Sequence, residues 1–260
     1  MIRLNGPTIA GDSSERTEEA PTLHFVLQGR DGVGKTVVAL LLSQCIEETS
    51  KPVVSVIADP LHASLAGLAA PDPERLSIFA GDRIDERALD RFIGKFPCED
   101  VHVVVDSAAS AFVPVGRCLV ENDVEAKMSE AGHDVVVHVV VTGGPGMLDT
   151  MRGLDAVARD FPPRVRIVVW LNEHFGPIVN AKGKPFEELP AYTDNRERIF
   201  ALVRLAMLSE SASADLQMMF DRRLTFARAL APDNTTILCV RKSRLFRIRQ
   251  ALWPQIARAL

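Results

Sequence analysis

The feature that most constrains this chain is a glycine-rich loop that follows a short apolar run. Residues 29–36 read Gly-Arg-Asp-Gly-Val-Gly-Lys-Thr, which matches the phosphate-binding pattern G-x-x-x-x-G-K-[ST]. Glycine lets backbone N–H groups approach an anion, and a helix that begins at Lys35 turns its positive dipole end to the same place. The sequence therefore predicts a strand over 24–27, a phosphate-binding loop and a helix over 35–48.

The residue types in the loop fit a nucleotide with Mg²⁺. Lys35 offers a point charge to the β- and γ-phosphates, and the Thr36 hydroxyl is a magnesium ligand. The other candidates for nucleotide contact lie in the loop or at the start of its helix: Gly29, Arg30, Asp31, Gly32, Val33, Gly34 and Val37. The alternative is a glycine turn that holds no ligand.

Composition limits the class of protein but says little of its partners. The 260 residues are 47% hydrophobic, which suffices for one large α/β domain. A net charge of −4 gives no overall attraction to nucleic acid or anionic lipid, so such binding needs a local basic patch. The four cysteines lack metal-binding spacing, and neither a spanning apolar run nor a signal-peptide core is present. We expect a cytoplasmic protein with reduced thiols.

Apolar runs and helical segments alternate after a polar leader, residues 1–22, that we expect to be flexible. The runs cover 24–27, 52–58, 101–106, 134–141 and 164–172, with a further short strand near 76–79. Helices are expected near 35–48, 83–96 and 147–160, and another helix is expected after residues 112–115, within 111–131. This alternation predicts an α/β fold with a doubly wound, mostly parallel sheet and helices on both faces. The predicted domain spans 23–240.

The pattern after the fifth run is less regular. It predicts helices over 195–208 and 214–230 and a short strand over 236–240. The last 20 residues, 241–260, hold six Lys or Arg and no acid, interleaved with apolar residues. They predict a basic amphipathic helix that extends the domain. Either it docks on the body with its basic face exposed, or it contacts lipid or DNA.

Polar residues end three of the predicted strands. Ligands bind at the carboxyl ends of the strands in open α/β sheets, so these residues are candidates for function. Asp106 is the candidate second magnesium ligand beside Thr36. Asp59 follows the second strand, and Asn172 ends the fifth, where an amide that both donates and accepts suits an adenine edge. Each also fits a cap or a turn, and the glycine run at 143–146 is either a ligand loop or a turn.

Taken together, the loop at 29–36, Asp59-Pro60, Asp106 and Trp170-Leu171-Asn172 resemble the ParA/MinD family of deviant Walker ATPases. The resemblance covers the chain from Leu23 to about Phe246. Within the family it is strongest to proteins of plasmid conjugal transfer.

The resemblance implies a function and a set of site roles. ATP would lie between two protomers of an ATP-induced homodimer, with Mg²⁺ near Thr36 and Asp106 and the base read by Asn172. Asp59 would position the attacking water for slow hydrolysis to ADP and phosphate. Other conjugation or partition proteins are the implied partners, with DNA contact indirect or weak.

Four residues depart from the family pattern. The family loop usually reads K-G-G-V-G-K, and its first lysine reaches the partner's nucleotide, whereas this chain has Arg30-Asp31. Arg30 keeps the charge and adds a planar donor fork, but Asp31 places a carboxylate beside the phosphates. Ile57 stands where many relatives have an acid, and His62 stands where those of conjugal transfer tend to have an asparagine. Slow or altered turnover is therefore expected.

Three functions compete at this stage. The first is an Mg-ATP-dependent dimerising ATPase of DNA mobilisation or partition, with Lys35, Asp59 and Arg30 as catalytic residues. The second is a nucleotide-dependent interaction module with little or no hydrolysis, which Asp31 favours and Asp59 disfavours. A small-molecule kinase is disfavoured because neither a substrate-binding lid nor a second catalytic constellation is visible.

Overall fold

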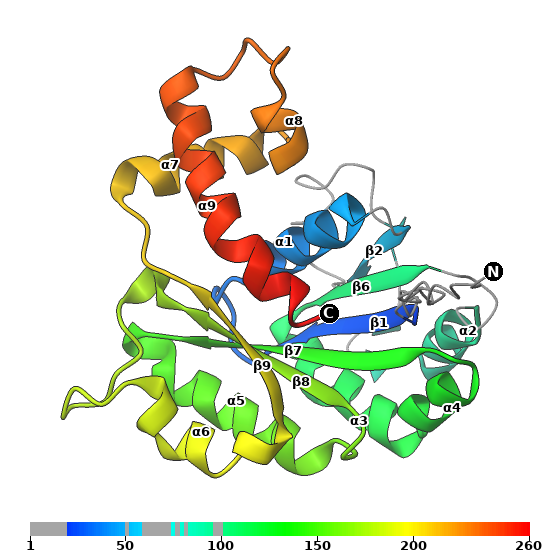
Figure 1. Ribbon diagram of the computed structural model, residues 1–260. Helices are drawn as coiled ribbons and strands as arrows, with labels where there is room; N and C mark the ends of the chain where they lie inside the picture. The colour runs from blue at the N-terminus through cyan, green and yellow to red at the C-terminus, as the bar shows by residue number, and fades with distance from the viewer. Residues whose placement is uncertain (1–19, 50–51, 59–73, 76–78, 81–82, 96–100) are drawn as a thin grey trace, which may run out of the picture.

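The computed structural model of the chain describes residues 20–49, 52–58, 74–75, 79–80, 83–95 and 101–260. Strands and helices alternate along it (Figure 1). The strands are β1 (Thr22–Leu27), β2 (Val53–Ala58), β3 (Glu74–Arg75), β4 (Phe79–Ala80), β5 (Arg83–Ile84), β6 (His102–Ser107), β7 (Asp134–Thr142), β8 (Arg166–Asn172) and β9 (Ile199–Leu205). The helices are α1 (Lys35–Glu48), α2 (Glu86–Lys95), α3 (Phe112–Glu121), α4 (Val124–Glu130), α5 (Met147–Asp160), α6 (Pro190–Thr193), α7 (Glu210–Asp221), α8 (Phe226–Leu230) and α9 (Cys239–Ala257).

The main sheet has the order β3-β2-β6-β1-β7-β8-β9, and every neighbouring pair in it is parallel. β1 lies between β6 and β7, where Val26 is level with Asp106 on one side and His138 on the other. The prediction of a doubly wound, mostly parallel sheet is confirmed. The polar residues at the carboxyl ends of β6 and β8 therefore lie at the same edge as the glycine loop.

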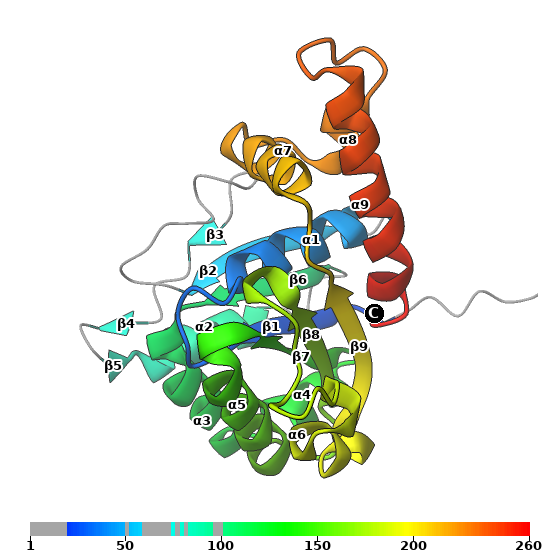
Figure 2. The same ribbon diagram turned by 90° about the vertical axis from the view of Figure 1, so that its left-hand side faces the viewer.

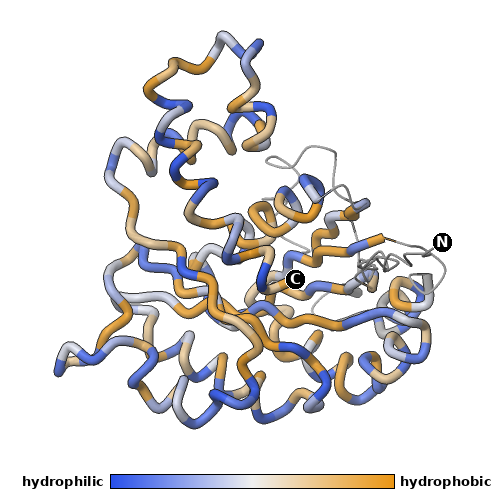
Figure 3. Tube along the Cα trace, in the orientation of Figure 1, coloured by the Kyte–Doolittle hydropathy of each residue, from blue (hydrophilic) through white to orange (hydrophobic). Residues whose placement is uncertain are grey.

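Helices cover both faces of the sheet, as the side view shows (Figure 2). Alternate residues of each strand enter two separate cores, and in β1 Phe25 packs with α3 and α5 while Val26 packs with α1. The second core is also formed by α7, α8 and α9. Because both faces are covered, β7 is apolar from Val135 to Val141 apart from His138. Orange predominates in the strands of the central sheet in Figure 3.

The prediction of a helix over 195–208 is wrong. Residues 199–205 form β9, which pairs in parallel with β8 and places Trp170 level with Val203. A short apolar run fits a helix or a strand equally well by its pattern alone. The open edge of β8 decides between them, because its backbone N–H and C=O groups are paired only if the next segment is extended.

The boundaries near the C-terminus also differ from expectation. The predicted helix over 214–230 is interrupted after α7, where Arg223 adopts a left-handed φ of 55° before α8 begins. The predicted strand over 236–240 is wrong, because α9 begins at Cys239. The helix expected after residues 112–115 already begins at Phe112 and is likewise two helices, divided at Asp123 with φ 49°.

Helix α9 docks on the body of the domain by its apolar stripe, which is one of the alternatives that the sequence allows. Leu245, Ile248, Leu252 and Ile256 are buried in the core shared with α1. The Trp253 indole donates a hydrogen bond of 2.8 Å to Glu48 at the end of α1. No described helix combines the length and the apolar sequence that crossing a membrane needs.

Three buried side chains with ring nitrogen atoms, Trp170, His138 and His24, form a hydrogen-bonded row across the sheet. The Trp170 indole donates to His138 Nδ1 at 2.9 Å, and His138 Nε2 lies 3.0 Å from His24 Nδ1. Because indole is only a donor, His138 carries its proton on Nε2 and donates it to His24. Burial is the main cause that lowers the pKa of His138 to about 3 and the pKa of His24 well below its usual value; the nearby Arg166 charge lowers both further.

These histidines make the folded state sensitive to acid. They stay neutral in the native protein and take up protons near pH 6.5 when the chain unfolds, so stability is lost as pH falls below 6.5. Each should remove about 1.4 kcal/mol from the free energy of unfolding per pH unit. Urea unfolding at pH 7.5, 6.5 and 5.5 measures this slope. His24→Leu should flatten it, whereas exposed His174→Asn should not; an unchanged slope in His24→Leu contradicts the assignment.

Candidate nucleotide-binding site

The glycine loop lies between the carboxyl end of β1 and the start of α1. Gly32 and Gly34 adopt left-handed φ angles of 72° and 96°, which favour glycine. No side chain caps the N-terminus of α1, and its first turn contains no acidic residue. The N–H groups of that turn and the positive end of the helix dipole are therefore available to an anion.

Lys35 is folded back over this loop. Its side chain is only 8% exposed, and Nζ donates a hydrogen bond of 3.0 Å to the Arg30 carbonyl. The Asp31 carboxylate lies 4.0 Å from the same Nζ, but its side chain is 89% exposed. The positive charge is thus held inside the loop, and the added carboxylate points largely into solvent.

Thr36 and Asp106 are brought together from the two sequence segments in which they were singled out. The Thr36 hydroxyl donates a hydrogen bond of 2.8 Å to Asp106 Oδ2 at the end of β6. Both offer oxygen atoms, the ligand type that Mg²⁺ prefers, so the pair fits that ion. Ile57 is level with Asp106 in the neighbouring β2 and is buried in the core beneath α1.

Asn172, at the end of β8, is hydrogen-bonded to the glycine loop. Its Nδ2 donates a hydrogen bond of 2.9 Å to the Val33 carbonyl, and its Oδ1 accepts one from the His174 N–H. A Cβ at Gly34 would lie 2.8 Å from Nδ2, so only glycine fits beside this amide. Asn172 therefore shapes the loop itself, a role that sequence analysis did not assign to it.

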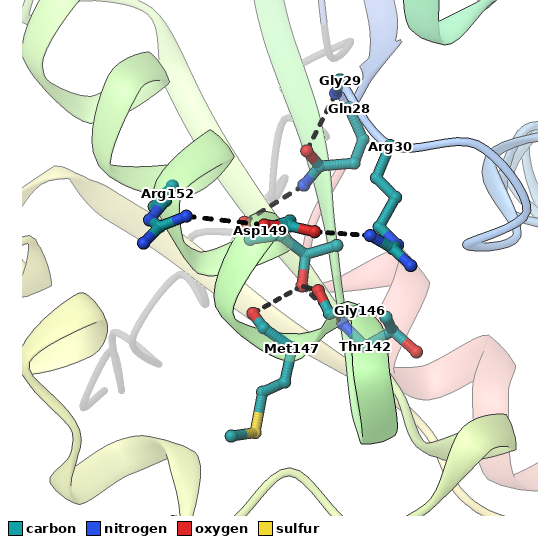
Figure 4. Close-up of polar contacts among 9 residues, drawn as sticks. Gln28, Gly29, Arg30, Thr142, Gly146, Met147, Asp149 and Arg152 are labelled. Carbon is teal, nitrogen blue, oxygen red and sulfur yellow. Dashed lines mark hydrogen bonds and ion pairs between the residues drawn. The ribbon is translucent and has the colours of Figure 1, made fainter.

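Gln28 is a further residue of the site that sequence analysis missed. Its buried side chain accepts a hydrogen bond from the Gly29 N–H (Figure 4). It donates hydrogen bonds to the carbonyls of Val140 and Thr150. These contacts tie the first residue of the loop to β7 and α5. The only available signal in the sequence was an amide that directly precedes the loop, at the end of an apolar run.

Arg30 is paired within its own chain. It lies 2.5 Å from Asp149 on α5, and Arg152 lies 3.6 Å from the other oxygen of that carboxylate (Figure 4). A cavity of about 570 Å³ lies beside this group, and Phe112 and Gly29 line it as well. The Arg30–Asp149 pair is roughly half exposed, so the arginine is accessible to other groups.

An apolar cavity of about 500 Å³ extends from the other side of the loop. Gly34, Val37 and Asn172 lie at one end, and Leu205 and Ala206 line the wall that follows β9. Helices α7 and α9 close the rest with mostly apolar side chains: Leu216, Phe220, Ile248, Ala251 and Leu252. A flat apolar group attached to a phosphate in the loop would find a matching surface here.

Three of the residues or segments singled out in the sequence are not part of the site as described. Asp59 and His62 lie outside the described residues. The glycine run at 143–146 serves packing, because a Cβ at Gly143 would lie 2.1 Å from the carbonyl oxygen of Gly176.

Two proteins named "Protein TraL", both from Escherichia coli, are similar to this chain over almost their whole length. One is 38% identical over 235 residues, which cover 90% of this chain and 96% of the relative. The other is 37% identical over 238 residues, which cover 91% and 98%. The chain belongs to the TraL family.

The fold of this TraL-family member also occurs among solved structures. It is similar to a ParA family ATPase from Chlorobium tepidum TLS, with a TM-score of 0.54, 14% identity, and coverage of 88% of this chain and 98% of that chain. At this identity the likeness establishes the fold. No known family profile matches the sequence. The fold that the resemblance to ParA/MinD ATPases implies is thus confirmed.

The Gln28 contacts predict that Gly153 on α5 cannot be enlarged. A Cβ there would lie 2.3 Å from Gln28 Oε1, and moving that side chain breaks its buried hydrogen bonds. Gly153→Ala should therefore lower the free energy of unfolding by about 1–3 kcal/mol in urea titration.

The matched control is Gly94→Ala on α2, where nothing lies within 4 Å of the added Cβ. It should be neutral or stabilising by up to about 1 kcal/mol. In a Gln28→Ala background Gly153→Ala should cost little, because the clashing group is gone. An equal loss with and without Gln28 would show that this clash is not the cause.

Proposed function

We propose that this protein is an Mg-ATP-dependent ATPase that dimerises on its nucleotide. The observation that carries the proposal is the convergence of Lys35, Thr36 and Asp106 on a glycine loop at an uncapped helix N-terminus. This arrangement combines a cation, a pair of oxygen ligands for a metal, and backbone donors. Phosphoryl transfer needs positioning and charge neutralisation from a protein, and these groups supply both.

The loop would hold the phosphates, with its backbone N–H groups and those of the first turn of α1 as donors. Lys35 would exchange the Arg30 carbonyl for phosphate oxygens, a short movement for a flexible side chain. The base would occupy the near end of the apolar cavity, beside Asn172, Leu205 and Ala206. Thr36 and Asp106 would hold Mg²⁺, which neutralises charge on the phosphates when bound.

Hydrolysis requires a water molecule aligned with the γ-phosphorus. We assign its positioning to Asp59, on the resemblance and on its place directly after β2. Water forms the new bond to the γ-phosphorus, and the bond from that phosphorus to the bridging oxygen breaks to release ADP.

The cellular setting follows from the family. Membership in the TraL family and the sequence resemblance support a role in conjugal plasmid transfer, with DNA partition as the related possibility. The alternative is a nucleotide-dependent switch with little hydrolysis. The proximity of Asp31 to Lys35 favours slow turnover, and phosphate release by the parent protein separates the two.

Lys35→Ala tests nucleotide binding. It removes the cation from the loop and should abolish most of the affinity for Mg-ATP in titration calorimetry. Lys182→Ala, an exposed lysine on a distant loop, is the matched control and should bind like the parent. Parent-like binding by a folded Lys35→Ala variant would refute the assigned site.

Arg30 tests the dimer. If it acts on the partner's nucleotide, Arg30→Ala should bind Mg-ATP like the parent at low protein concentration but lose ATP-induced dimerisation in sedimentation velocity. An Asp59→Ala background suppresses hydrolysis. Asp149→Ala breaks the same ion pair yet leaves Arg30 available, so it should still dimerise. Equal loss in both variants would assign the effect to the ion pair, and a parent that never dimerises would refute the dimer.

A further inference from the structure

One end of the molecule is strongly basic. We call residues 222–247 the distal tip; they comprise the α7–α8 connection, α8, the loop after it and the first nine residues of α9. Seven Lys or Arg and one acid give this segment a net charge of +6 in a chain of −4, so the remaining residues together carry −10. The tip projects away from the sheet beyond α1 in both ribbon views (Figures 1 and 2).

Most of this charge faces solvent. Arg222, Arg223, Arg228 and Arg247 are exposed. Arg244 and Arg241 are paired with the buried Asp215, at 2.5 Å and 3.6 Å. Positive potential therefore accumulates at the tip, while the rest of the protein is acidic.

The tip also exposes apolar side chains among these cations. Leu238 and Val240, at the start of α9, are 68% and 59% exposed, and the exposed Cys239 lies between them. Phe246 is 44% exposed and lines a groove of about 420 Å³ with Lys242 and Arg247. In Figure 3 orange, hydrophobic segments alternate with blue, hydrophilic ones at this end of the trace. These apolar side chains are not buried against the rest of the chain, whereas the apolar stripe of α9 is buried in the core.

We propose that the distal tip docks on an anionic lipid bilayer. The cations would lie at the headgroup phosphates, and Leu238 and Val240 would enter the interface below them. DNA offers the same phosphates, but contacts to its backbone are made by charged and polar groups and give no reason for adjacent exposed aliphatic side chains. The combination of both kinds of side chain favours lipid.

This surface is distinct from the nucleotide site and does not depend on it. Leu238 and Val240 belong to neither cavity beside the glycine loop. Docking by the tip should therefore persist in a Lys35→Ala variant that no longer binds nucleotide, so the lipid proposal and the ATPase proposal fail separately.

Vesicle cosedimentation of the full chain tests the proposal. The protein should pellet with vesicles of phosphatidylcholine and phosphatidylglycerol, should not pellet with phosphatidylcholine alone, and should dissociate as salt is raised. Leu238→Ser with Val240→Ser should weaken binding by at least about tenfold, because two apolar side chains no longer enter the interface. Arg228→Glu with Arg247→Glu should weaken it as well.

The matched control is Val113→Ser, which removes a similarly exposed side chain, 61% exposed, from α3. It should bind vesicles like the parent, and all variants should keep the parent's thermal melting point within a few degrees. Parent-like binding by the Leu238 and Val240 variant would overturn the proposal. The proposal would also be overturned if the parent bound a labelled DNA duplex but not the anionic vesicles, and if the double variant still bound that DNA.

Discussion

Parallel pairing on both edges of β1 is the constraint on which the rest of this structure depends. β6 and β7 flank it, and every residue from Thr22 to Leu27 is buried. Its carboxyl end therefore has one fixed position, and the glycine loop leaves from that point. The same pairing makes β6 end beside the loop, so Asp106 reaches Thr36 although 70 residues separate them in sequence.

Three buried or partly buried hydrogen bonds then fix the shape of the loop before any ligand is bound. Gln28 holds its first residue, Asn172 holds the Val33 carbonyl near its end, and Asp106 holds Thr36 at the start of α1. The three side chains come from different places in the sheet: Gln28 directly follows β1, Asp106 lies in β6 and Asn172 ends β8. A loop that is held in this way loses little conformational entropy when it binds an anion, which is a general route to tight binding.

Helix α9 connects this site to the remote part of the molecule. Its middle and C-terminal part packs on α1 and forms one wall of the apolar cavity beside the loop, while its first nine residues belong to the distal tip. The polar and charged residues of the helix differ in the same way between its two ends. Arg249 and Trp253 are used in contacts with Glu48, whereas Arg247 faces solvent. One amphipathic pattern in the sequence thus serves two purposes at its two ends.

The sequence by itself determined the parallel α/β fold and the loop, and it singled out Thr36 and Asp106 as candidate magnesium ligands, because strand ends and glycine spacing are local patterns. It determined α5 over 147–160 to the residue. Tertiary structure decided the rest. The segment at 199–205 is a strand because β8 leaves an edge to be paired, and Gln28 is part of the site because α5 happens to pack where its amide points. The Gln28 contacts join residues more than 100 positions apart, and no local pattern of side chains encodes either interaction.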